Sequence, residues 1–120
     1  MAKDLRISYL LDFYGDMLTD KQREVVELYY NEDLSLAEIA AISKITRQGV
    51  RDSIKRAESQ LLEYEERLGL AQRFRQVQAA AGEIRRLAKE IDFCNNKYSF
   101  ANEISENARQ IIRLADSLDD

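Results

Sequence analysis

Proline is absent from this 120-residue sequence and glycine occurs at only four positions, so few residues can interrupt a helix. The stretches between the glycines are rich in alanine, leucine, glutamate, arginine and glutamine, which have high helix propensity. No segment alternates apolar and polar residues for long enough to predict a sheet. The sequence therefore predicts an all-α protein.

Local signals mark the first helices. Residues 4–16 carry apolar residues at spacings of three and four, which predicts a helix with one apolar face. That face consists of Leu5, Tyr9, Leu10, Phe13 and Met17. Thr19 with Gln22, and Ser35 with Glu38, then match the capping box, in which two side chains satisfy the first N–H groups of a helix. Two further helices are expected to begin there.

A short helix followed closely by a longer one is the next feature. Ile39 and Ile42 follow the second capping box, and Thr46 is the predicted N-cap of a helix from Arg47 to about Arg67. The buried stripe expected for this longer helix consists of Val50, Ile54, Ala57 and Leu61. Two helices in such tight succession within a small bundle predict a helix-turn-helix.

Gly69 predicts a break between two domains, residues 1–68 and 69–120. Beyond it, a heptad seam consists of Leu70, Phe74, Val77, Ala81, Ile84, Ala88 and Ile91. The segment DFCNNKY, residues 92–98, is the predicted loop, and Ser99 the predicted cap of a last helix. A matching seam in that helix consists of Ile104, Ala108, Ile111, Ala115 and Leu118. The pattern predicts a C-terminal helical hairpin, whose seam closes within the chain or in a homodimer through residues 70–118.

The sequence lacks most of the residues and motifs that enzymes commonly use for catalysis. Histidine is absent, Cys94 is the only cysteine, and no glycine-rich phosphate-binding motif occurs. We therefore expect a protein that is not an enzyme, with no catalytic residues, no metal, no cofactor and no small-molecule substrate. No apolar run is long enough to cross a membrane, and the N-terminus lacks the core of a signal peptide. A cytoplasmic protein without membrane insertion is the expectation.

Basic residues gather at the start of the longer helix, although the formal net charge is −4. The candidate nucleic-acid-binding residues are Lys44, Arg47, Gln48, Arg51, Lys55 and Arg56. In a helix-turn-helix the first turns of the second helix meet base edges, where arginine recognises guanine and glutamine recognises adenine. A helical wheel places Arg47, Gln48, Arg51 and Lys55 on one flank, and Lys44 in the turn is expected to touch a phosphate. The alternative is a solvated helix face, muted by the ion pairs Asp52–Arg56 and Arg51–Glu58.

The motifs carry a family resemblance. LTDKQREVVELYY (18–30), SLAEIA (35–40), TRQGV (46–50), IKR (54–56) and YEERL (64–68) follow one another in order. They resemble the region-four helix-turn-helix of bacterial sigma factors, which docks on the promoter −35 element, and more closely the YlxM family, also known as UPF0122. The resemblance implies a non-enzymatic regulator connected with the signal recognition particle pathway, with DNA or the particle RNA bound by the helix after Thr46. The alternative is a protein-only adaptor for the particle GTPase or its receptor, with the helix-turn-helix as a scaffold.

Four residues depart from the family pattern around the turn. Lys44 occupies the usual glycine position, and Ser43 fills the apolar site that Ile42 precedes by one place. Gly49 stands where the family usually has alanine, and Arg51 replaces its usual tyrosine. These departures concern the geometry of the turn rather than the presence of the motif.

Overall fold

A computed structural model describes residues 2–98 and 100–118 of the protein. Within those ranges the chain forms six α-helices and one short 3-10 helix, with no strand, so the all-α prediction is confirmed. The predicted cap Ser99 lies outside the described residues. None of the helices described is both long and apolar enough to cross a membrane. The chain divides into two compact units, Met1–Ala71, the N-terminal bundle, and Gln72–Asp120, the C-terminal hairpin.

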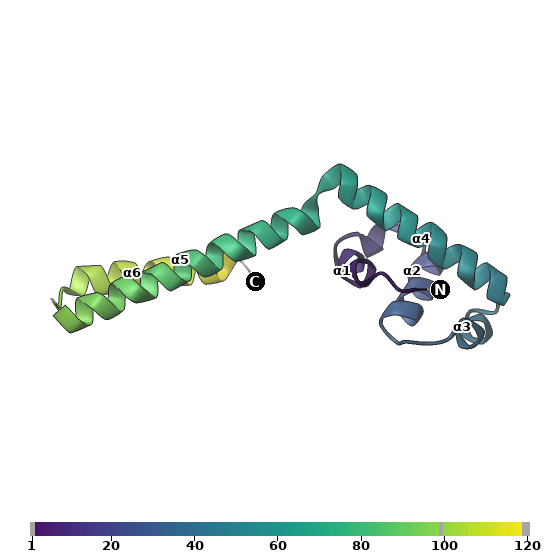
Figure 1. Ribbon diagram of the computed structural model, residues 1–120, viewed down its shortest axis with the longest axis horizontal. Helices are drawn as coiled ribbons and strands as arrows, with labels where there is room; N and C mark the ends of the chain where they lie inside the picture. The colour runs from purple at the N-terminus through teal and green to yellow at the C-terminus, as the bar shows by residue number, and fades with distance from the viewer. Residues whose placement is uncertain (1, 99, 119–120) are drawn as a thin grey trace. The chain divides into compact units, whose positions relative to one another are not determined.

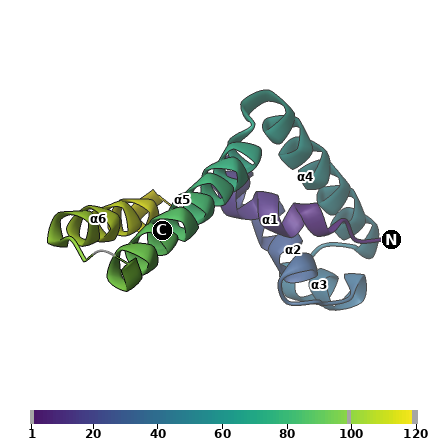
Figure 2. The same ribbon diagram turned by 60° about the vertical axis from the view of Figure 1, so that its left-hand side comes forward.

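The N-terminal bundle consists of α1 (Leu5–Tyr14), η1 (Gly15–Met17), α2 (Asp20–Tyr30), α3 (Leu36–Ser43) and α4 (Arg47–Leu68). The long helix α4 packs against α1, α2 and α3, as Figures 1 and 2 show. Both predicted capping boxes are present, at Thr19 and at Ser35. These caps satisfy N–H groups that would otherwise lack partners, and so fix where the helices begin.

The core of the bundle has two parts, joined along α4. Val50 and Ile54 pack with residues of α2 and α3, whereas Ala57 and Leu61 pack with α1. All four are fully buried, which confirms the predicted stripe. Fully burying a large aliphatic side chain contributes about 1.5–3 kcal/mol. The same stripe therefore holds the helix-turn-helix together and attaches it to α1.

Two residues of the predicted apolar face of the first helix were wrong. Leu5 is 85% exposed and Met17 51%. Leu5 lies in the first turn of α1, and Met17 ends a 3-10 helix that changes the phase of the pattern after Tyr14. The buried face of α1 instead consists of Ile7, Leu10, Leu11 and Tyr14.

Leu70 and Ala71, the first two residues of α5 (Leu70–Tyr98), still belong to the N-terminal bundle. Gly69 ends α4 in the left-handed conformation, with φ of 63°, so the predicted break is present. The Tyr14 hydroxyl donates to Glu65 Oε1 at 2.6 Å and accepts from the Leu70 backbone N–H at 3.0 Å. The Ala71 N–H donates to the same Glu65 oxygen at 3.0 Å. These bonds hold the two residues within the bundle.

The hairpin consists of α5 and α6 (Asn102–Leu118), which lie side by side and run in opposite directions. The predicted loop at 92–98 was wrong, because α5 continues to Tyr98. Asn95 is buried within that segment and connects the two helices. Its Nδ2 donates to the Ala101 carbonyl at 2.8 Å and to Ser105 Oγ at 3.1 Å, while its Oδ1 accepts from the Ala101 N–H at 3.0 Å. Asn95, one of the asparagines that suggested a loop, therefore connects the end of α5 to the start of α6.

The predicted heptad seams were only partly correct. Their alanines, Ala81, Ala88, Ala108 and Ala115, are buried. The larger members Leu70, Ile84, Ile91, Ile104, Ile111 and Leu118 are exposed by 39–52%. Small residues let helix backbones approach closely, so the hairpin closes on its alanines and leaves the larger residues beside the seam. The prediction that 1–68 and 69–120 are separate domains stays a prediction about independent folding.

Candidate nucleic-acid interface

In the turn between α3 and α4, Lys44 adopts the left-handed backbone conformation that glycine usually occupies. Lys44 is the C-cap of α3, with φ of 58° and ψ of 43°, in the left-handed region. Its N–H and that of Ile45 donate to the Ala40 carbonyl. A residue with a Cβ pays roughly 1–2 kcal/mol for this conformation. The departure at Lys44 therefore leaves the turn intact and places a cation at its tip.

Ser43 explains why the neighbouring site is not apolar. Its side chain is buried, and its Oγ donates to Glu24 Oε1 at 3.1 Å. Its carbonyl accepts from Lys21 Nζ at 2.5 Å. A buried hydroxyl is tolerated when it is hydrogen-bonded, and here it binds the end of α3 to α2. These bonds fix the position from which α4 departs.

The N-terminus of α4 begins at Thr46, whose Oγ1 accepts from the Gly49 N–H at 2.9 Å, as predicted. The first turn holds no acidic residue. The positive end of the helix dipole is thus not neutralised by a carboxylate of that turn, and it favours anions nearby. A Cβ at Gly49 would lie 3.2 Å from Thr46 Oγ1, so an alanine there would press on the cap.

The structure brings together three of the six predicted residues. Arg47, Gln48 and Arg51 line one hollow beside Leu36 at the start of α3. Lys55 is exposed one turn further along α4. Arg56 is also exposed, but nine residues from Arg47 amount to two and a half turns, so it lies on the opposite side of the helix. The fifth cation of the set, Lys44, is exposed in the adjacent turn.

Asp52 and Glu58, the carboxylates of α4 nearest this flank, have partners other than the arginines. Asp52 accepts from Gln48 Nε2 at 2.9 Å, and Glu58 accepts from the hydroxyl of Tyr30. The expected ion pairs Asp52–Arg56 and Arg51–Glu58 do not form among the described residues. The positive charge on this flank is therefore less neutralised than the sequence suggested.

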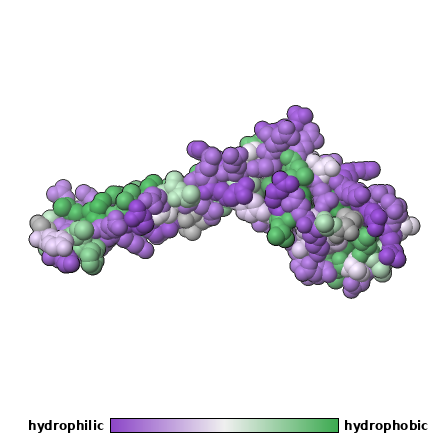
Figure 3. Space-filling view, in the orientation of Figure 1, coloured by the Kyte–Doolittle hydropathy of each residue, from purple (hydrophilic) through white to green (hydrophobic). Residues whose placement is uncertain are grey.

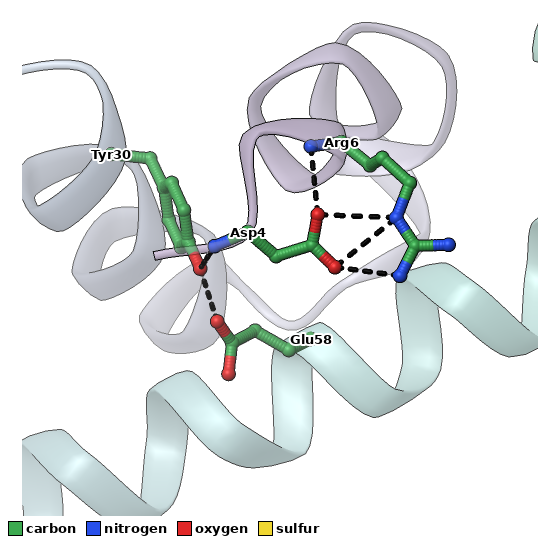
Figure 4. A network of polar contacts seen from close by, with 4 residues as sticks. All are labelled: Asp4, Arg6, Tyr30 and Glu58. Atoms are coloured by element: carbon green, nitrogen blue, oxygen red, sulfur yellow. Dashed lines mark hydrogen bonds and ion pairs between the residues drawn. The ribbon is translucent and has the colours of Figure 1, made fainter. Parts of the chain in front are cut away.

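Sequence analysis missed the contact that holds Glu58, which Figure 4 shows. The Tyr30 hydroxyl donates to Glu58 and accepts from the backbone N–H of Asp4 at 3.4 Å. Burial raises the pKa of Tyr30 well above its usual value, and the hydrogen bond to Glu58 raises it further. Asp4 also caps α1 and pairs with Arg6 at 2.7 Å. No sequence signal links these residues, because 28 positions separate Tyr30 from Glu58.

Comparisons with known proteins agree with this geometry. A family model described as "UPF0122: Putative helix-turn-helix protein, YlxM / p13 like" matches residues 1–100. A UPF0122 protein of Clostridium novyi (strain NT) is 37% identical over 113 residues, which cover 94% of this chain and 98% of the relative. A UPF0122 protein of Bacillus cereus (strain AH187) is 40% identical over 119 residues, 99% of each chain. With a helix-turn-helix in place and near full-length similarity, the chain belongs to the UPF0122 family.

Proposed function

We propose that this protein is a cytoplasmic, non-enzymatic regulator that binds duplex nucleic acid through the first turns of α4. The observation that carries the proposal is the gathering of Arg47, Gln48 and Arg51 in one hollow at the capped start of that helix. Neither Asp52 nor Glu58 takes up these arginines, because both accept from other side chains.

Each residue has a distinct role in this proposal. Arg47 and Arg51 present guanidinium groups for guanine edges, the commonest specific contact in the major groove. Gln48 exchanges its bond to Asp52 for an adenine edge. Lys44 in the turn and Lys55 further along α4 contact phosphates, which position the helix without reading sequence. Arg56, on the other side of α4, contributes to the field only.

Nucleic acid would be bound by the local positive charge at the start of α4, because the chain as a whole has a net charge of −4. Each phosphate contact releases counterions and contributes a slope of about −0.9 in log K against log salt for B-DNA. Two to four contacts would then give a shallow salt dependence. A protein that coats nucleic acid through a broad cationic surface would show a much steeper one.

Fluorescence anisotropy with duplex DNA and with the signal recognition particle RNA, from about 25 to 200 mM salt, tests the proposal. Arg51→Glu should weaken binding roughly 5- to 150-fold, since a bidentate contact contributes about 1–3 kcal/mol. Arg109→Glu is the matched control, because it makes the same change of charge at an exposed position of α6. Absence of binding to both nucleic acids at low salt, or equal losses in the two variants, would contradict the proposal.

The second candidate, a protein-only adaptor, is favoured by a mainly acidic hollow along α2. Its lining has four carboxylates and one cation, and consists of Asp20, Arg23, Glu24, Glu27, Leu28 and Glu32. Arg23 pairs with Glu27, so Asp20, Glu24 and Glu32 supply the net negative charge. A basic surface on the particle GTPase or its receptor would complement those charges. Co-sedimentation with the purified GTPase distinguishes the candidates: the adaptor requires binding that survives Arg51→Glu and weakens with Glu32→Lys, at an exposed position of the hollow. The control Glu106→Lys reverses a charge on α6 instead.

A further inference from the structure

Each helix of the hairpin carries a second heptad stripe beside the one that closes the hairpin. On α5 the second stripe consists of Ile84, Leu87, Ile91, Cys94 and Tyr98. On α6 it consists of Ile104, Asn107, Ile111, Leu114 and Leu118. Every member is exposed. Each helix therefore carries a heptad stripe that packs against no other helix of the described residues.

The two stripes form one continuous face. Leu87, Ile91 and Tyr98 of α5 line an open groove together with Ile104 of α6. Around the axis of each helix, the exposed stripe is rotated by about a quarter of a turn from the buried alanines. The direction of this rotation, viewed from the N-terminus of each helix, is the same in α5 and α6. Because the helices are antiparallel, this offset turns both stripes to the same side of the hairpin. A continuous hydrophobic band along the hairpin is visible in Figure 3.

The area of this face exceeds what a monomer usually exposes. Eight large apolar side chains of the stripes are exposed by between 39% and 74%. With roughly 200 Å² for a large side chain, they present on the order of 800 Å². The largest apolar patch of a typical monomer is about 300–600 Å². Each partner in a stable protein–protein interface contributes about 800 Å².

We propose that this face binds the same face of a second copy of the chain, so that two hairpins form a four-helix bundle. The heptad spacing favours a helical partner. Side chains repeating every three and four residues pack into the spaces between the side chains of another helix. Both helices of the hairpin carry the pattern, as two helices contributing to one bundle must. Asn107 is the polar position in an otherwise apolar stripe of α6, and such a residue specifies register in helical assemblies.

The charges beside the stripe suit self-association. Glu83 and Glu90 lie along its edge on α5, and both pair with Arg86. Two identical surfaces that carried unpaired carboxylates along one edge would repel each other. Arg86 offsets one of these two negative charges within each chain, which lessens the repulsion between copies.

Sedimentation equilibrium of the full chain is the first test. At tens of micromolar the expected mass is twice the 13.9 kDa of one chain. Leu87→Glu should return it to the mass of one chain, with circular dichroism confirming that the helices remain. Phe93→Glu is the matched control, since Phe93 is an exposed apolar residue of α5 outside the stripe, and it should leave the dimer intact. A wild-type monomer at 100 µM, or a Leu87→Glu dimer, overturns the proposal.

Cys94 provides a second measurement that needs no substitution. Its thiol is exposed in the single chain and lies on the stripe. In a dimer the modification rate with a thiol reagent should fall several-fold as protein concentration rises, and in Leu87→Glu it should not depend on concentration. A wild-type rate that is independent of protein concentration would contradict an interface between two copies of the chain. The apolar face would then be covered by another protein or by another part of the same chain. Neither test involves nucleic acid, so each can fail while the proposed function stands.

Discussion

The N-terminal bundle and the C-terminal hairpin are built from the same helix-favouring residues but bury different parts of them. The bundle buries its large residues, such as Ile54 and Leu61, between α4 and three other helices. The hairpin buries alanines and leaves most of its isoleucines and leucines exposed. Two helices alone cannot surround a large side chain, whereas four can. The comparison shows that a heptad pattern specifies the period of a seam but not which of two adjacent stripes closes it.

The largest effect expected from this comparison is in the bundle. Ile54→Ala removes a fully buried side chain and should lower the free energy of unfolding by about 2–5 kcal/mol. Ile42→Ala makes the same exchange at an exposed position of α3 and should change it by less than about 0.5 kcal/mol. Chemical denaturation measures both. Similar losses in the two variants would contradict the difference in burial.

A second prediction concerns the alanine seam. Ala88→Leu puts three extra carbons where α5 and α6 approach closely, and should destabilise the hairpin by about 1–3 kcal/mol. Ala79→Leu places the same side chain at an exposed position of α5 and should be nearly neutral. Hydrogen exchange at α6 amides reports the hairpin separately. If Ala88→Leu protected those amides, the seam would have to contain unfilled space.

A third prediction uses the tyrosines of the bundle. The pKa values of Tyr30 and Tyr14 are raised, chiefly by burial and then by hydrogen bonds to Glu58 and Glu65. As pH rises past about 10, the usual tyrosine pKa, the unfolded chain releases these protons before the folded chain does. Stability should therefore fall above pH 10. Tyr30→Phe should cost about 1 kcal/mol at neutral pH through the lost hydrogen bond, and should make the alkaline loss less steep in pH-dependent denaturation.

The smallest effect is expected at the turn. Lys44→Gly relieves the left-handed strain but adds freedom to the unfolded chain, so a net gain of about 0.5 kcal/mol is expected in thermal unfolding. Lys55→Gly, in the middle of α4, should instead lose about 1 kcal/mol. A destabilised Lys44→Gly would mean that the lysine side chain stabilises the turn.

Features set by neighbouring residues were predictable from the sequence. The caps at Thr19, Ser35 and Thr46 depend on a side chain and a backbone N–H three positions away. The α4 stripe was predictable because α4 has neighbours along most of its length. The basic flank of α4 was also visible, although its role in binding stays a prediction.

Features set by distant contacts were not predictable. The exposure of Ile84 and Ile91 depends on which stripe meets α6, and both stripes share one period. The end of α5 was mistaken because the asparagines near Cys94 have low helix propensity, whereas the bonds of Asn95 to Ala101 and Ser105 stabilise that segment as helix. Glu58 was expected to pair with Arg51 because nothing in its own helix indicates Tyr30.

The bonds that keep Leu70 and Ala71 in the bundle also bear on how the chain folds during synthesis. Tyr14 needs the N–H of Leu70, and Ala71 belongs to the same core as α1. The ribosome must therefore release residue 71 before the first helix has its full set of partners. Until α4 has emerged, Ile7, Leu10 and Leu11 lack much of the surface that covers them, which is the condition in which nascent chains engage chaperones. The contacts of the hairpin join residues that are closer together in the sequence.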